Sequence, residues 1–488
     1  MNLWLPGKSS AAYGERVKIR AIEFSSLSPF AKGRIEFPAA TNADLAEVHI
    51  LTGVNGTGKS RLLAALAAAL GDSWELQRRS GARQDGEFAV EVDAGGEANA
   101  TVNLKLDSRG IAAIGPRTEA VLQALRESAA FAYSGGAHAG AEKPRAPGAP
   151  ANADPDRLSL EERVLSERLG FQRSMGHSER FAERLGKLVL QTKIDLANGE
   201  TTSPDLQLLN RILETVRWVV GAEFDFAVRK WPEDGLKVKW RKDTLELGQL
   251  PDGLRSLIAW MVDAGLMMTV LRDSKLIELR HKLSQLRGDA TMMENMMDYG
   301  GGFDPDVYDD TIKREAIVES EVEELEDDPR FVLDRPSILL LDEIETHLHP
   351  AWQRRVLPAM QRLFPKAQIF IATHSPFVIS SLNHGWIHRL RFDEAGNVKA
   401  YTPRKAALGD TYEDVLEDIM EMPERFDPDS EAMLNTFEAA RDAALAGDAS
   451  ALPKARELAV EIAKRGPALE DIVGRELRQL ERLMQPKQ

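Results

Sequence analysis

A phosphate-binding loop is encoded at residues 53–60, where the sequence reads Gly53-Val-Asn-Gly-Thr-Gly-Lys-Ser60. An apolar β-type run ends at Thr52 immediately before it, and an Ala/Leu-rich helix is expected from about Ser60 to Leu70. The glycines let several backbone N–H groups approach phosphate oxygens, and the N-terminus of the helix adds partial positive charge. The alternative, a chance glycine-rich turn after a strand, is disfavoured by the full spacing and by both flanks. The pattern predicts a nucleoside polyphosphate as ligand.

The residues of this loop have different predicted tasks. Lys59 is placed to neutralise the terminal phosphates, and the hydroxyl of Ser60 is placed to ligate Mg²⁺. The remaining predicted contacts to the nucleotide come from Gly53, Asn55, Gly56, Thr57, Gly58 and Arg61. ATP and Mg²⁺ are therefore the expected cofactors.

Two further polar groups follow continuous apolar strands. Asp342-Glu343 comes after Ser337–Leu341, and His374 comes after a strand predicted at 367–373. Ligands of parallel α/β sheets bind at the carboxyl ends of the strands, so these groups are expected to converge with Lys59. Asp342 is predicted to hold Mg²⁺, Glu343 to act as general base, and His374 to sense the γ-phosphate. A salt-bridged surface pair and a structural histidine are the weaker alternatives.

The composition limits the class of protein. The net charge of −15 argues against wholesale coating of nucleic acid, and the chain has no cysteine for disulfides or thiolate metal sites. The first ten residues lack a secretory pattern, and no apolar segment is long enough to span a bilayer. We expect a cytoplasmic protein that has no membrane partner.

The pattern of periodicity and composition divides the chain into six segments. The predicted boundaries are 1–135 with the P-loop, 136–222 as linker and helical insertion, 223–271 as strand pair and helix, 272–331 as second insertion, 332–405 with Asp342 and His374, and 406–488 as C-terminal helices.

Four expectations bear on the second insertion. The helix before it is predicted to end at Leu271, and its acidic run up to Asp328 is predicted to be a solvated or disordered loop. No sustained heptad array is apparent, so no long coiled-coil arm is expected. Four methionines, at 292, 293, 296 and 297, are interpreted as core filler, with a partner-docking surface as the alternative.

The set GVNGTGKS, ILLLDEIETHLHP and IATHS resembles the ABC-type ATPase class that includes SMC, RecF and OLD proteins. Within that class it is most similar to the AAA/ABC-hybrid ATP-binding proteins of bacterial phage-defence systems, of the Septu, PARIS and retron-associated kind. The resemblance implies an α/β fold of the ABC-type P-loop NTPases, with a mixed sheet, helical insertions and a C-terminal helical tail.

The resemblance also assigns further segments. Ile344–Pro350 corresponds to the D-loop, and His374 to the switch histidine. The segment Phe131–Ser134 falls where the family has its Q-loop, although it contains no glutamine. Leu250-Pro251-Asp252-Gly253 is similar to the signature motif, which implies that Leu250, Asp252 and Gly253 contact the nucleotide of a second subunit. Pro251 stands where relatives have serine.

The resemblance implies a homodimer or higher homo-oligomer with ATP between subunits, and a separate effector protein, a nuclease or a toxin. ATP binding would close the dimer and hydrolysis would release it. Two alternatives stay open: a RecF-like DNA repair ATPase, and a scaffold that binds ATP with little turnover, suggested by Pro251. Whether nucleic acid binds also stays open.

Overall fold

The structure is a computed structural model that describes residues 17–40, 42, 44–71, 76, 86–93, 100–107, 110–114, 129–135, 172–173, 179–228, 235–298, 305–327, 331–406, 409, 411–422, 424–448 and 450–484. The chain forms two compact units, Met1–Val415 and Leu416–Gln488. Of the segment predicted as linker and helical insertion, residues 136–171 and 174–178 lie outside the described residues.

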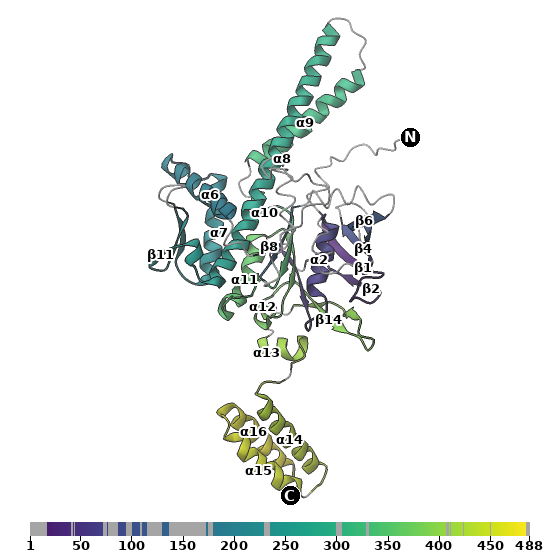
Figure 1. The fold of residues 1–488 in the computed structure, drawn as a ribbon, viewed down its shortest axis with the longest axis vertical. Coiled ribbons are helices and arrows are strands. Elements are labelled where there is room, and N and C mark those ends of the chain that lie inside the picture. The colour runs from purple at the N-terminus through teal and green to yellow at the C-terminus, as the bar shows by residue number, and fades with distance from the viewer. Residues whose placement is uncertain are drawn as a thin grey trace. The chain divides into compact units, whose positions relative to one another are not determined.

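A mostly parallel sheet forms the centre of the first unit (Figure 1). Its order is β15-β14-β3-β13-β12-β7-β8, and β14 through β8 run parallel. The bounds are β3 (Glu47–Thr52), β7 (Ala129–Ser134), β8 (Gln172–Arg173), β12 (Ser337–Asp342), β13 (Ala367–Ala372), β14 (Trp386–Phe392), β15 (Val398–Ala400) and β16 (Arg404–Lys405). Because β15 and β16 pair antiparallel with β14, the sheet is mixed. The predicted α/β fold class is confirmed.

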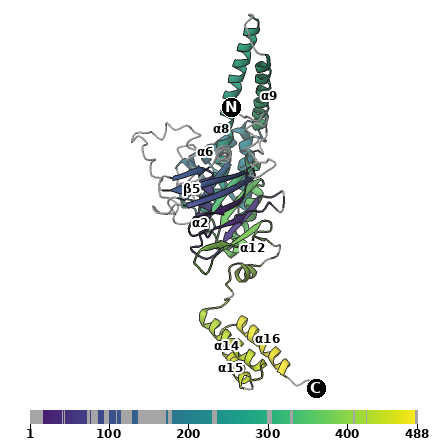
Figure 2. The same ribbon diagram turned by 90° about the vertical axis from the view of Figure 1, so that its right-hand side faces the viewer.

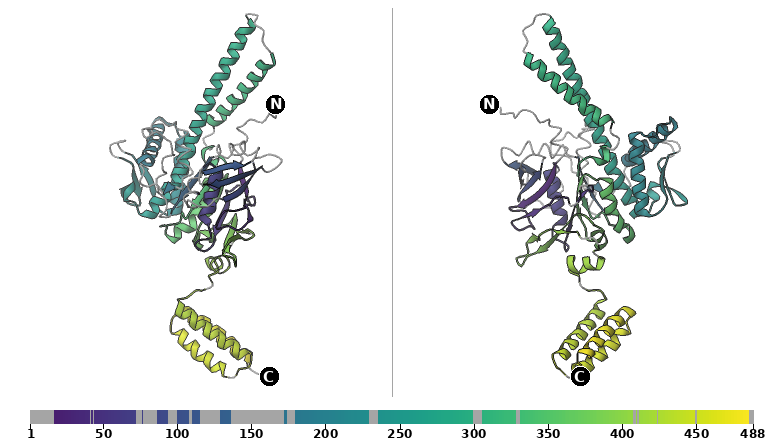
Figure 3. Two further views of the ribbon diagram at one scale, coloured as in Figure 1. Left: turned by 45° about the vertical axis from the view of Figure 1, so that its right-hand side comes forward. Right: turned by 180° about the vertical axis from the view of Figure 1, so that it is seen from behind.

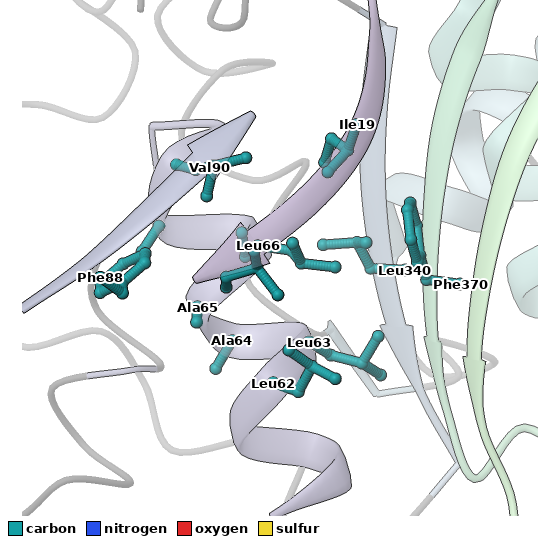
Figure 4. Close-up of a cluster of buried hydrophobic side chains, with 14 of the residues drawn as sticks. Ile19, Leu62, Leu63, Ala64, Ala65, Leu66, Phe88, Val90, Leu340 and Phe370 are labelled. Atoms are coloured by element: carbon teal, nitrogen blue, oxygen red, sulfur yellow. The ribbon is translucent and has the colours of Figure 1, made fainter. Parts of the chain in front are cut away.

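The helix after the glycine-rich loop at residues 53–58, α2 (Lys59–Ala69), lies between two sheets. The second sheet is antiparallel and has the order β2-β1-β4-β5-β6. Its strands are β1 (Lys18–Phe24), β2 (Gly33–Glu36), β4 (Gly86–Asp93), β5 (Ala100–Asp107) and β6 (Gly110–Ile114). Figure 4 shows Phe88 and Val90 on one side of α2 and Leu340 and Phe370 on the other. An Ala/Leu helix without a polar face suits this position, because both of its sides are buried.

A third sheet and several helices complete the first unit. The sheet has the order β11-β10-β9, with β9 (Phe224–Ala227), β10 (Lys237–Trp240) and β11 (Asp243–Glu246). The sequence predicted the first two strands and missed β11. The helices are α6 (Glu179–Ala197), α7 (Pro204–Val220), η2 (Leu247–Gln249), α10 (Phe331–Asp334), α11 (Pro350–Leu363), α12 (Pro376–Ser380) and α13 (Tyr412–Asp414).

The second insertion is a helical hairpin, so two predictions for it were wrong. Helix α8 (Asp252–Asp298) continues through Leu271 for 47 residues in all, and the acidic run forms α9 (Pro305–Asp327). Figures 1 and 2 show the two helices side by side. Leu276, Leu279, Leu283 and Leu286 recur at heptad spacing and pack against Val318, Val322 and Leu325. This short apolar seam orders a segment whose charge suggested disorder.

The methionines of this hairpin are mostly on the surface. The exposed fraction is 62% for Met292 and 43% for both Met296 and Met297. The interpretation of the cluster as core filler was therefore wrong for these three residues. Gly288, Thr291 and Asn295 line a shallow hollow together with Met292 and Met296.

The described residues of the second unit form the helices α14 (Pro428–Leu445), α15 (Ala451–Ala463) and α16 (Pro467–Met484), which lie side by side in Figure 3. Phe437 and Ile462 belong to the apolar core between these helices. A π-helical turn, η3 (Val415–Ile419), spans the boundary between the units. The sequence predicted this run of short helices. Among the described residues of both units, no helix is long and apolar enough to cross a membrane.

Candidate functional site

The loop between β3 and α2 has the backbone of a phosphate-binding loop. Gly53, Gly56 and Gly58 have φ of 151°, 87° and 79°, values that side chains disfavour. A Cβ at Gly53 would lie 2.2 Å from the carbonyl oxygen of Leu390, so that position also excludes a side chain on steric grounds. Asn55 and Gly56 are exposed at the tip, Thr57 is buried, and Arg61 is half-buried on α2. The loop presents accessible backbone at its tip on a rigid base.

Lys59 lies inside this loop. Its Nζ donates hydrogen bonds to the carbonyl oxygens of Gly53 at 2.8 Å and Val54 at 3.1 Å. Burial lowers the pKa of Lys59 to about 8, although the carboxylates of Glu343, Asp342 and Glu345 act to raise it. A phosphate placed here would give the amine a stronger partner than two neutral carbonyls.

Ser60 and Asp342 meet although 282 positions separate them. The hydroxyl of Ser60 donates a hydrogen bond of 2.8 Å to Oδ1 of Asp342, and Asp342 is 4% exposed. A hydroxyl oxygen beside a buried carboxylate is a donor set that suits a hard cation such as Mg²⁺. Ser134, the last residue of β7, is the neighbour of Asp342 in the sheet register, at the segment that resembles the Q-loop.

Glu343 stands at the tip of β12 in a constrained turn. Its φ is 50°, and its N–H donates to the carbonyl oxygen of Ala372 at 2.9 Å. Gly135 packs directly against it: the Gly135 N–H donates to the Asp342 carbonyl oxygen, and a Cβ at Gly135 would lie 2.1 Å from the Glu343 carbonyl oxygen. Gly135 was not among the predicted site residues, although a glycine directly after a buried strand was a usable signal.

His374 follows β13 and is half-buried. Burial and the charge of Lys59 lower its pKa, which outweighs the opposite effect of Asp342. The imidazole is therefore neutral near pH 7 and carries both one N–H donor and one acceptor. The electrostatic coupling of His374 with both Lys59 and Asp342 is consistent with the expected convergence of the three strand ends.

The segment that resembles the signature motif lies at the start of α8. The side chain of Leu250 is 3% exposed, and Asp252 forms an ion pair with Arg255. A Cβ at Gly253 would lie 2.4 Å from the carbonyl oxygen of His347, so this segment packs against the D-loop region of its own chain. His349, which follows, caps α11 by accepting the Ala351 N–H at its Nδ1.

The comparisons with known families agree with these motifs. Residues 329–380, which contain Asp342, Glu343 and His374, match the family described as "AAA domain, putative AbiEii toxin, Type IV TA system". The matched segment thus covers β12, α11 and β13, the elements that carry half of the candidate site. The central sheet and the loop at residues 53–60 resemble those of the P-loop ATP-binding class.

Three relatives share part of their sequence with this chain. The chain is 32% identical over 114 residues to Septu protein PtuA of Bacillus thuringiensis, which covers 23% of this chain and 29% of that protein. It is 33% identical over 93 residues to the retron Ec83 probable ATPase of Escherichia coli, with 19% and 16% covered. It is 42% identical over 45 residues to the retron Vc95 probable ATPase of Vibrio cholerae serotype O1 biovar El Tor, with 9% of each covered. The chain spans less than a third of these relatives. The predicted resemblance to Septu and retron-associated ATPases is confirmed.

Solved structures are matched over most of the chain. An SMC head bound to the C-winged helix domain of ScpA aligns with 79% of this chain and 97% of its own, at a TM-score of 0.41 and 13% identity. The recombination mediator protein RecF aligns with 80% of this chain and 99% of its own, at a TM-score of 0.33 and 12% identity.

Proposed function

We propose that this protein binds ATP with Mg²⁺ and hydrolyses it. The observation that carries the proposal is the hydrogen bond from Ser60 to Asp342, with Lys59 in the adjacent loop, because it joins the two halves of a nucleotide site from distant parts of the sequence. Phosphoryl transfer to water needs positioned charge more than covalent chemistry. The site offers a cation, a carboxylate pair and a neutral imidazole for that task.

Each residue of the site has a proposed role. The N–H groups of residues 53–61 and the Lys59 amine bind the phosphates, and Ser60 and Asp342 hold the metal, which supplies positive charge beside the phosphates. Glu343 orients and deprotonates the attacking water. His374 would hydrogen-bond the terminal phosphate.

We further propose that two copies close over ATP and that this switch controls a separate effector, a nuclease or a toxin. Similarity to Septu protein PtuA and to the retron ATPases supports this proposal. In the closed dimer, Asp252 and Gly253 would face the nucleotide of the partner. The contact predicted for Leu250 does not fit its side chain, which is buried within its own chain. Gly253 already packs against the backbone of His347 in the segment that resembles the D-loop, so a movement of either segment would displace the other.

The function is tested by comparing three proteins for ATP binding and hydrolysis with Mg²⁺. Wild type is expected to bind and hydrolyse ATP, Lys59→Ala to lose binding, and Glu343→Gln to bind while its hydrolysis rate falls by about 10²-fold or more. Equal, near-zero rates in wild type and Glu343→Gln would favour a binding scaffold. Stimulation by DNA with a steep salt dependence would favour a repair function.

A further inference from the structure

Glu345 is a buried carboxylate that the proposed chemistry does not use. It lies two residues beyond Glu343 and is only 7% exposed. Its Oε1 accepts hydrogen bonds from the hydroxyl of Thr373 and from the backbone N–H of His374, the latter at 3.1 Å. Its Oε2 is buried without a hydrogen-bond partner. A carboxylate buried in this way is costly, so packing alone does not explain it.

The contacts of Glu345 continue into a closed ring of hydrogen bonds. The Ser375 N–H donates to the Thr373 hydroxyl at 3.0 Å, and the Ser375 hydroxyl donates to Oε1 of Gln353 at 2.6 Å. Gln353, on α11, donates from Nε2 to the carbonyl oxygens of Leu348 at 2.9 Å and Glu345 at 3.4 Å. The ring joins the turn after Glu343, the first turn of α11 and the loop that carries His374.

A backbone hydrogen bond also joins the ends of β12 and β13, and it involves Glu343 itself. The N–H of Glu343 donates to the carbonyl oxygen of Ala372 at 2.9 Å. Glu343 is thus hydrogen-bonded to Ala372, the last residue of β13, and Glu345 is hydrogen-bonded to the two residues that follow it, Thr373 and His374. Because the backbone is held at both points, the loop of Glu343 and the loop of His374 have little freedom to move apart.

We propose that Glu345 is a positioning residue that, together with Gln353, holds the switch-histidine loop at a fixed place relative to Glu343. The inference rests on the proposed ATPase function. Glu345 does not contact substrate; it acts through the backbone of His374. One hydrogen-bonded unit then fixes the positions of the general base and of the phosphate-sensing imidazole relative to each other. The affinity for ATP depends separately on residues 53–61.

The test replaces Glu345 by leucine and by glutamine. Glu345→Leu removes the acceptor and is expected to lower kcat by about 10- to 100-fold, with the KM for ATP changed by less than about threefold. Glu345→Gln keeps an acceptor oxygen for Thr373 and His374 and is expected to stay within about threefold of wild type. Adding Glu345→Leu to His374→Ala should slow the enzyme by no more than about twofold beyond His374→Ala alone.

A matched control separates positioning from general stability. Glu47 is also a buried, hydrogen-bonded glutamate, but it lies at the opposite end of β3 from the phosphate-binding loop. Glu47→Gln is expected to lower the melting temperature and leave kcat unchanged. If Glu345→Leu does not fold, Thr373→Val, which removes one donor to the same oxygen, is expected to show the same selective loss of kcat.

Hydrogen exchange gives a readout that does not depend on turnover. In Glu345→Leu, amides 373–375 should exchange faster while those of α2 stay protected, and Glu345→Gln should restore the protection. If the exchange changes in this way but the wild-type protein hydrolyses no ATP, the proposed function is refuted, while the positioning role of Glu345 is still supported. Unchanged exchange, an additive double variant, or equal losses in kcat and ATP affinity would refute the role of Glu345.

Discussion

At the scale of single residues, the site depends on close backbone contacts at the ends of β3, β7 and β12. Gly53 and Gly135 each lie so near a carbonyl oxygen of another segment that a methyl group cannot be accommodated. Gly53 shapes the phosphate-binding loop, whereas Gly135 supports the turn of Glu343. We therefore expect substitutions at these two glycines to affect different steps, binding and hydrolysis, by the same steric cause.

Gly135→Ala is expected to displace Glu343, because the new Cβ would lie 2.1 Å from its carbonyl oxygen. The hydrolysis rate should fall by about tenfold or more, while ATP still binds through residues 53–61. Steady-state kinetics and nucleotide titration measure the two effects. Gly288→Ala, where nothing lies within 4 Å of the added methyl group, is the matched control and should change neither. An unaffected rate in Gly135→Ala would show that the turn adjusts freely.

At the scale of elements, α8 runs from the region of the candidate site into the helical hairpin, of which it forms the first helix. It begins next to the D-loop backbone at Gly253 and ends at Asp298, beyond the exposed methionines. The pairing of α8 with α9 rests on the apolar seam and on ion pairs such as Arg280 with Glu326 at 2.7 Å. Since the ion pairs are exposed, the apolar seam contributes most of the stability of the pairing between α8 and α9.

Leu279→Ala is expected to weaken the hairpin, since Leu279 is 2% exposed in the seam. A loss of about 2–3 kcal/mol should increase hydrogen exchange along α9. ATP binding should persist, because residues 53–61 belong to another part of the fold. Met292→Ala, at a position 62% exposed, should change the stability by less than about 0.5 kcal/mol. Comparable exchange in both variants would contradict the role of the seam.

At the scale of the whole molecule, the first unit carries a buried polar cluster in its central sheet. Glu47 accepts hydrogen bonds from Arg20 at 2.9 Å and from Gln368 at 2.5 Å, and it contacts His49 at 3.1 Å. Burial acts to raise the pKa of Glu47, but His49 and the charges of Lys18 and Arg20 bring it down to about 2. Burial lowers the pKa of His49, so its ring is neutral near pH 7 and Arg20 is the direct ion-pair partner of Glu47.

Glu47 is expected to make the free energy of unfolding depend on pH in the acid range. Because its pKa falls from 4.5 to about 2 on folding, it contributes about 3 kcal/mol that is fully present above pH 4.5 and is lost as the pH falls through 2. Chemical denaturation from pH 6 to pH 2 should therefore show a smaller loss in Glu47→Gln than in wild type. Parallel curves for the two proteins would refute this account.

The local sequence determined the chemistry and most of the core elements. Residues 53–60, the apolar run before Asp342 and the strand before His374 could be interpreted alone, because phosphate binding and strand burial depend on neighbours in the chain. The predictions for the acidic run and for the methionines failed. Composition reports the average charge of a segment, whereas a few leucines at heptad spacing decide whether it pairs.

The tertiary structure alone decided which distant residues meet. The order β3-β13-β12-β7 sets Ser60 against Asp342, Gly135 beneath Glu343, and Glu345 against Thr373 and His374. The sequence predicted that the ends of these strands converge, but the individual contacts depend on the pairing and register of strands that are far apart in the chain. The proposed phosphate-binding chemistry is thus determined by the local sequence, while the geometry that the proposed hydrolysis requires is set by the sheet.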